Sequence, residues 1–181
     1  GSRLSLMNAI IKNCSAEGDF FAPRNGAAVV SEGSTVEAVN CVFMHNRAGN
    51  RGGVAHKGTW KTTNCTVYGN SGNGGVGYDV DWTGVNTIFW DNSSVFGGAS
   101  SAALTYSDIQ QDGFVAGTGN ISDEPMFVST SEPYDLRLQA GSPCIDIGTS
   151  EGAPSTDIDG NPRQQGAGFD MGAYERTGET D

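Results

Sequence analysis

A seven-residue pattern recurs along this chain and constrains its fold more than any other feature. In each copy a leading Asn is followed by small and apolar residues in alternation, and a second Asn closes the copy. Residues 40–46, 64–70 and 86–92 match one another position for position, and looser copies begin at Asn8 and Tyr106. The starting positions are 32, 24, 22 and 20 residues apart. A drifting period of this length is typical of a solenoid in which each repeat forms one turn.

Each repeat is expected to contain three short strands. The first precedes the leading Asn and the second follows it. Side chains alternate with a period of two along a strand, so Cys65 and Val67 face one side, which we assign to the interior. A glycine-rich segment, such as residues 52–55 or 74–77, permits the tight bend that starts the third strand. Strands that return to the same slot in the same direction predict a parallel β-helix.

The repeats and the rest of the chain divide the fold into two parts. We predict an all-β structure with about five coils in residues 1–117. Residues 118–181 contain short apolar segments between Gly and Pro turns, and none of these segments matches another. A solenoid ends in an atypical unit that covers its last open coil, so this part is predicted to be an irregular, β-rich cap continuous with the helix.

The leading Asn of each copy is expected at a sharp bend between two strands. Asn tolerates the left-handed backbone conformation better than most residues, and its side-chain amide can bond the Asn of the next coil. We therefore predict an internal ladder of Asn8, Asn40, Asn64 and Asn86. Cys41 and Cys65 occupy the same slot in successive copies, so they are expected in the core as small apolar residues.

The charge balance limits the partners of this chain. Ten basic and 21 acidic residues give a net charge of −11, which repels phosphate backbones and anionic membrane surfaces. Nucleic acid is therefore not an expected partner, and no apolar run predicts membrane insertion. The chain enters a strand-like segment directly after Gly1, so we expect a helix truncated at its N-terminus. Its first strands would form an open edge, which favours self-association through that end.

Several motifs resemble those of secreted bacterial right-handed parallel β-helix proteins, including proteins whose C-terminal region is called a choice-of-anchor Q domain. The motifs occupy residues 88–92, 106–110, 119–121, 135–138, 141–146, 157–163 and 170–175. The upstream repeats are also similar to those of polymorphic outer-membrane adhesins. The resemblance implies a right-handed, pectin-lyase-like solenoid that serves as a display scaffold, secreted or at the cell surface. It implies no catalytic set.

Catalysis is the first alternative, because parallel β-helices include polysaccharide lyases and hydrolases. A lyase needs carboxylates that hold Ca²⁺ beside a basic residue, but no repeating carboxylates are in register with Arg47, Arg51, Lys57 or Lys61. A hydrolase needs paired carboxylates. Asp79 and Asp81 form such a pair, with Asp91 nearby, yet strand carboxylates are more often solvated edge charges.

These patterns assign no catalytic residue. His45 and His56 each stand alone and are expected at the surface.

An outward column of apolar side chains is the best candidate for binding. Met44, Tyr68 and Trp90 share one slot in successive coils, and flat aromatic rings at that spacing could hold sugar rings. These three are the candidate carbohydrate-binding residues. In the alternative interpretation the C-terminal tail folds back and covers the column, since proteins rarely leave such patches bare.

A second candidate site is a short acidic motif in the tail. Asp157, Asp159 and Asn161 alternate around a glycine and could bind Ca²⁺ with help from Asp146 or Asp170. The motif lacks the rest of an EF-hand loop. The alternative is a set of Asx turns closed by a salt bridge from Arg163 to a tail carboxylate.

Two functions follow from the sequence. The first is a non-catalytic, adhesin-like extracellular or cell-surface β-helix that binds a polysaccharide or surface glycan. The alternative is the C-terminal part of a polysaccharide lyase or glycoside hydrolase whose site lies mainly on further coils.

Overall fold

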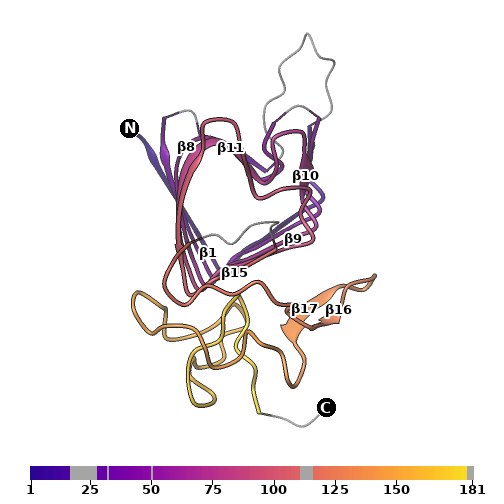
Figure 1. Ribbon diagram of the computed structural model, residues 1–181, viewed down its shortest axis with the longest axis vertical. Helices are drawn as coiled ribbons and strands as arrows, with labels where there is room; N and C mark the ends of the chain where they lie inside the picture. Colours follow the sequence, from indigo (N-terminus) through magenta and orange to yellow (C-terminus); the bar gives the residue numbers. More distant parts are fainter. Residues whose placement is uncertain (17–27, 32, 50, 111–115, 179–181) are drawn as a thin grey trace.

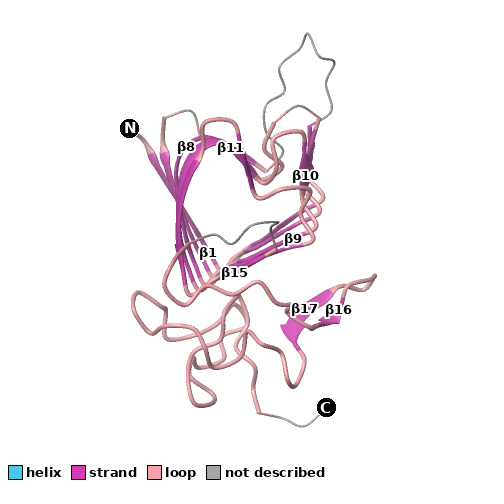
Figure 2. Ribbon diagram, in the orientation of Figure 1, coloured by secondary structure: helices cyan, strands magenta, loops and turns pink. Residues whose placement is uncertain are grey.

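The computed structural model describes residues 1–16, 28–31, 33–49, 51–110 and 116–178. Regular structure in these residues consists of β-strands, and no helix is present among them. Figure 1 shows the strands of successive turns stacked over one another around a common core, with the tail, in orange and yellow, along one side. The chain is therefore an all-β parallel β-solenoid with a tail of mostly irregular structure, as Figure 2 shows.

Three parallel sheets form the sides of the solenoid. The largest contains β1 (Arg3–Met7), β5 (Thr35–Val39), β8 (Ala55–Thr63), β11 (Gly77–Val85) and β14 (Ser101–Thr105), with the short strands β4 (Val29–Val30) and β13 (Phe96–Gly97). The second contains β2 (Ile10–Lys12), β6 (Val42–Met44), β9 (Thr66–Tyr68), β12 (Ile88–Trp90) and β15 (Asp108–Ile109). The third contains β3 (Ser15–Ala16), β7 (Arg47–Ala48) and β10 (Ser71–Gly72).

The strands make about three turns rather than the five expected. The sequence count was too high because it treated every copy of the pattern as a complete coil. The copies at the two ends are less complete: β3 precedes residues outside the described part, and β14 and β15 have no companion strand in the third sheet among the described residues.

The glycine-rich segments lie where the backbones of successive turns approach closely. A Cβ added to Gly53 would lie 2.7 Å from the carbonyl oxygen of Ser71. The strand that was predicted to start after this segment is not separate from the strand before Asn64. Both belong to β8, which has nine residues. His56 therefore lies within a sheet and is fully buried, so its expected place at the surface is wrong. His45 is half-buried beside Tyr68 and Tyr134.

The core consists of side chains from the same slots of successive coils. Cys41, Phe43, Cys65, Val67 and Phe89 are completely buried, as the alternation predicts. The rings of Trp60 and Trp82 stack with centroids 5.1 Å apart. Each indole N–H has a partner inside the core, Ser31 Oγ at 3.1 Å for Trp60 and Thr62 Oγ1 at 3.0 Å for Trp82.

The backbone bends at the start of each copy as predicted. The φ angles of Asn8, Asn40, Asn64, Asn86 and Tyr106 are 50°, 50°, 49°, 51° and 47°. These values lie in the left-handed region, where Asn is several times more common than most residues.

The tail first extends the stack and then folds back along it. Ile121 forms a parallel bridge with Asp108 of the last coil. Farther on, β16 (Phe127–Ser129) and β17 (Asp135–Leu138) form an antiparallel pair. Apolar side chains of the tail pack against the outer face of the second sheet, among them Phe127, Leu136, Leu138, Cys144, Met171 and Ala173. This second apolar cluster fixes the tail on the solenoid.

Candidate functional site

The predicted carbohydrate-binding residues do not form a bare column. Met44 and Tyr68 are 6% and 4% exposed because Phe127 and its neighbours in the tail cover them. At Met44 and Tyr68 the structure therefore agrees with the alternative interpretation, in which the tail folds over the column. Trp90, on the next coil, is only half-buried.

Two hollows of the surface meet at Trp90 and Asp91. One, with a volume of about 760 Å³, lies between these residues and Tyr68, residues 124–131 and Gln139. The other, of about 650 Å³, extends over residues 91–95, Gln110 and Ser122. We call the two hollows together the Trp90 trough. It is built jointly by the second sheet and by the tail.

Tyr68 forms a rigid wall of the trough. Its ring meets Phe127 edge to face, with centroids 5.6 Å apart, and meets His45 at 5.5 Å. Burial, together with the nearby carboxylate of Asp91, raises the pKa of Tyr68. The backbone N–H of Asp91 in turn donates to Gln110 Oε1 at 2.6 Å. Asp91 is thus bonded to the following coil.

The rim of the trough combines apolar and polar groups. Met126 and Val128 remain 37% and 47% exposed beside it. Ser129, Thr130, Ser131 and Gln139 add hydroxyl and amide groups on the same side. A surface that offers an indole face, apolar patches and several hydrogen-bonding groups can hold a sugar ring, which has both an apolar face and hydroxyl edges.

The structure does not place the predicted carboxylate pair in the trough. Asp79 lies 3.5 Å from Arg51 in an ion pair, and Asp81 accepts a hydrogen bond from Ser101 Oγ at 2.7 Å. The trough brings together Asp91 and Glu124 instead. Glu124 could not be chosen from the sequence, because nothing in the repeat indicates which tail residue faces Trp90.

The acidic motif of the tail forms Asx turns. Asp157 is buried, and its Oδ1 accepts the backbone N–H groups of Asp159 at 2.9 Å and Asn161 at 2.8 Å. Its Oδ2 accepts from Asn161 Nδ2 at 3.1 Å and from the N–H of Glu175 at 3.0 Å. Asp159 forms an ion pair with Arg137. Among the described residues, no group of three or more His, Cys, Asp or Glu side chains is arranged to hold a metal ion.

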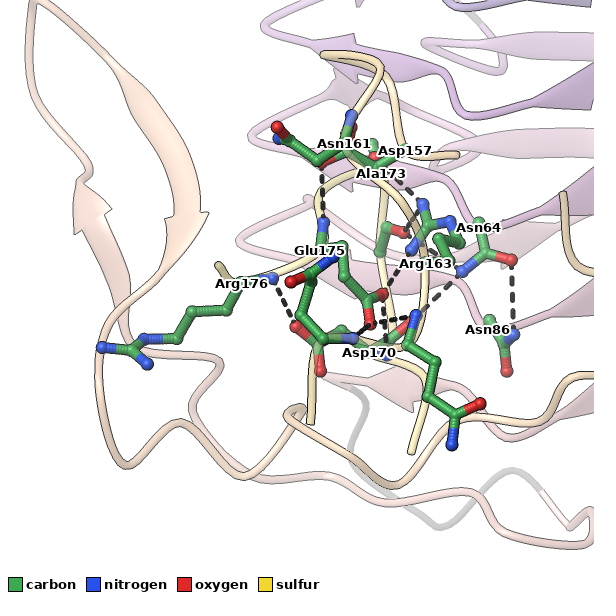
Figure 3. A network of polar contacts seen from close by, with 12 residues as sticks. Asn64, Asn86, Asp157, Asn161, Arg163, Asp170, Ala173, Glu175 and Arg176 are labelled. Atoms are coloured by element: carbon green, nitrogen blue, oxygen red, sulfur yellow. Dashed lines mark hydrogen bonds and ion pairs between the residues drawn. The ribbon is translucent and has the colours of Figure 1, made fainter. Parts of the chain in front are cut away.

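A buried ion pair closes these turns. Arg163 Nη1 lies 3.0 Å from Glu175 Oε2, and both side chains are almost completely buried. Figure 3 shows this ion pair among the polar contacts around it. The second oxygen of Glu175 accepts the backbone N–H groups of residues 164 and 165. The salt bridge that the sequence offered as the alternative to calcium is therefore present.

The same arginine interrupts the leading asparagine ladder. Nη2 of Arg163 donates to Asn40 Oδ1 at 2.9 Å, and the Asn64 amide donates to the carbonyl oxygen of Asp170 at 3.2 Å. The ladder keeps only the links from Asn40 to Asn8 at 3.1 Å and from Asn86 to Asn64 at 3.3 Å. The prediction of one continuous ladder through these four residues is wrong, because a tail residue bonds where the next coil was expected to bond.

A buried carboxyl group lies elsewhere beneath the tail. Asp108 is fully buried, and Cys144 Sγ lies 3.2 Å from its Oδ2. Burial raises the pKa of Asp108 to about 7. Burial and the neighbouring Asp108 also raise the pKa of the Cys144 thiol. The pair joins the last coil to the tail and does not line the trough.

Comparison with protein-family models, curated proteins and solved structures finds no match. Within the described residues, no helix is long and apolar enough to span a membrane.

Proposed function

We propose that this chain is a non-catalytic, adhesin-like β-solenoid, secreted or at the cell surface, that binds a polysaccharide or surface glycan in the Trp90 trough. The observation that carries the proposal is the half-buried indole of Trp90 at the junction of two polar-rimmed hollows. The right-handed, pectin-lyase-like winding and the relation to choice-of-anchor Q proteins belong to the same proposal. They rest on the motifs of the sequence.

The trough suits an extended ligand better than a single small molecule. The two hollows share Trp90 and Asp91 in their linings, so a chain of sugar rings that passes over the indole can enter both. Met44 lies beneath the tail and outside the lining, and Tyr68 lines one hollow but is only 4% exposed. Trp90 is therefore the residue on which direct sugar contact depends.

A glycan array followed by calorimetry tests the proposal. We expect Trp90→Ala to weaken binding about fivefold, because an aromatic contact contributes on the order of 1 kcal/mol. Tyr78→Ala is the control, since Tyr78 is also half-buried but lies on β11 outside the trough. No binding by the intact protein, or equal binding by a folded Trp90→Ala variant, contradicts the proposal.

A polysaccharide lyase or glycoside hydrolase is the second candidate. One observation favours it: Asp91 and Glu124 line the same hollow, and paired carboxylates perform glycoside hydrolysis. Incubation with a panel of polysaccharides, followed by assays for reducing ends and for unsaturated products, separates the candidates. Turnover that disappears in both Asp91→Asn and Glu124→Gln supports the enzyme and removes the non-catalytic proposal.

We also propose that a second copy of the chain associates with β1, the edge strand of the largest sheet among the described strands. Leu4 is 42% exposed although its partner in register, Val36, is 1% exposed. Among the described strands β1 pairs only with β5, so its other edge offers unpaired backbone groups beside the exposed Leu4. Sedimentation equilibrium should show dimers that Leu4→Glu disrupts, whereas Ile147→Glu, at an exposed site in the tail, leaves them intact. A monomer at all concentrations contradicts this proposal.

A further inference from the structure

Every charged side chain in the described lining of the Trp90 trough is a carboxylate. Asp91 and Glu124 are both exposed, and the described lining contains no Lys, Arg or His. Glu124 has no hydrogen bond or ion pair with any described residue. Asp91 forms no ion pair with any described residue, and its carboxylate helps to raise the pKa of Tyr68. The trough therefore presents two carboxylates that no neighbouring cation neutralises.

Several basic residues of the described chain are engaged in ion pairs elsewhere, and none of the described basic residues lines the trough. Arg51 pairs with Asp79, Arg163 is buried against Glu175, and Arg137 pairs with Asp159. Lys12 shares the outward column with Trp90, but it lies three strands away, which corresponds to about 14 Å. The net charge of −11 adds to the negative potential around the trough.

We propose that the trough selects polysaccharides that carry free amino groups, such as chains of glucosamine, over neutral and anionic chains. This inference rests on the proposed function, because it names the class of glycan for that site. A protonated amino group donates up to three hydrogen bonds and forms charge-assisted bonds with carboxylates. It is also attracted to the face of an indole. The trough offers both partners, with Trp90 beside Asp91.

The same geometry opposes acidic glycans. A uronic acid chain would place its carboxylates against Asp91 and Glu124 without a cation between them, and like charges at this range repel. Neutral chains keep the contact with Trp90 but gain nothing from the two carboxylates. The expected order of affinity is therefore amino-sugar chain, neutral chain and uronate chain.

Calorimetry with oligosaccharides of equal length tests this order. The probes are a glucosamine oligomer, its fully N-acetylated counterpart, a neutral glucose oligomer and a galacturonate oligomer, at a pH that keeps the amino groups protonated. We expect the glucosamine oligomer to bind about tenfold more tightly than its N-acetylated counterpart, since exposed ion pairs contribute up to about fivefold each. Added salt should reduce this difference.

Variants distinguish the site from general attraction to an acidic protein. Asp91→Asn and Glu124→Gln should each weaken glucosamine binding about threefold to fivefold and weaken neutral binding less. Asp81→Asn and Glu151→Gln remove the same charge outside the trough and should have no effect. The inference is overturned if the control variants lose as much affinity for the glucosamine oligomer as the trough variants do. It is also overturned if the N-acetylated oligomer binds as tightly as the free amine.

Failure of this inference and failure of the proposed function give different results. If none of the oligosaccharides binds, the glycan-binding proposal fails. If neutral oligosaccharides bind in a manner that depends on Trp90 and the amino group adds nothing, glycan binding stands and only the charge selection is lost.

Discussion

The two asparagine columns of the solenoid use the same residue in different ways. In the closing column, Asn46 Nδ2 donates to Asn70 Oδ1 at 3.0 Å, and Asn70 Nδ2 donates to Asn92 Oδ1 at 3.0 Å. Each oxygen also accepts a backbone N–H from the preceding coil. In the leading column, by contrast, the tail bonds to Asn40, Asn64 and Asn86.

This difference shows that stacking alone does not determine what an asparagine bonds. Among the described residues, the amides of the closing column bond only one another and backbone groups. The leading column lies on the side where the tail docks, and there amide groups serve as anchors for a non-repeating segment. One column holds the coils together and the other holds the tail.

The largest expected effect concerns the anchor of the tail. Arg163→Met leaves the buried Glu175 without its cation and should lower the free energy of unfolding by about 3–5 kcal/mol. Urea denaturation measures this loss. Arg137→Met is the control, because its ion pairs with Asp135 and Asp159 are exposed and should contribute less than about 1 kcal/mol. Equal losses in the two variants contradict the anchoring role of Arg163.

The loss of stability on removing an asparagine of the closing column should depend on how deeply that asparagine is buried. Asn70→Ala leaves the backbone N–H and the side-chain amide of Asn46 without their shared acceptor, and should cost about 1–3 kcal/mol. Asn92→Ala, at the half-exposed end of the column, should cost less because water can replace its bonds. A greater loss for Asn92→Ala in the same denaturation experiment contradicts a column that is strongest inside.

The contact between tail and solenoid should depend on pH. Burial raises the pKa of Asp108 to about 7 and that of Asp170 to about 6, from an ordinary value of 3.8. The folded chain therefore keeps these protons at a pH where the unfolded chain has lost them. Their contribution to stability is fully present below about pH 4 and is lost as the pH rises through 6 and 7.

The pH dependence is isolated by comparison with one variant. Between about pH 5 and pH 7, the intact protein should lose about 1–2 kcal/mol relative to Asp108→Asn, which has no such proton to lose. Asp81→Asn, at an exposed position, serves as the control. Parallel stability curves for the intact protein and Asp108→Asn are the outcome that contradicts this prediction.

The smallest expected effect is that of calcium on the tail. Both oxygens of Asp157 already accept N–H groups, so Ca²⁺ would have to displace four hydrogen bonds. We expect addition of Ca²⁺, or its removal by a chelator, to change Tm by less than about 1 °C, because a ligand stabilises only in proportion to its binding. A rise of several degrees that Asp159→Asn abolishes would restore the metal interpretation.

The sequence determined the parts of the structure that repeat. The spacing of the asparagines predicted parallel strands, left-handed bends and a core that contains Cys41 and Cys65. These features depend on interactions between equivalent residues of neighbouring coils, and such interactions are visible as a period. The count of turns failed because an imperfect copy of the pattern, such as the one at Tyr106, does not reveal whether all three strands of its coil form.

Only the tertiary structure decided where the tail lies. The apolar pair Leu136 and Leu138 and the outward apolar column indicated that each needs a partner, and this was the one signal for the covered face. No pattern could show that Arg163 reaches Asn40, or that Glu124 faces Trp90. These contacts join residues far apart in a segment without repeats, so they depend on the shape and polarity of two surfaces that exist only after the solenoid has formed.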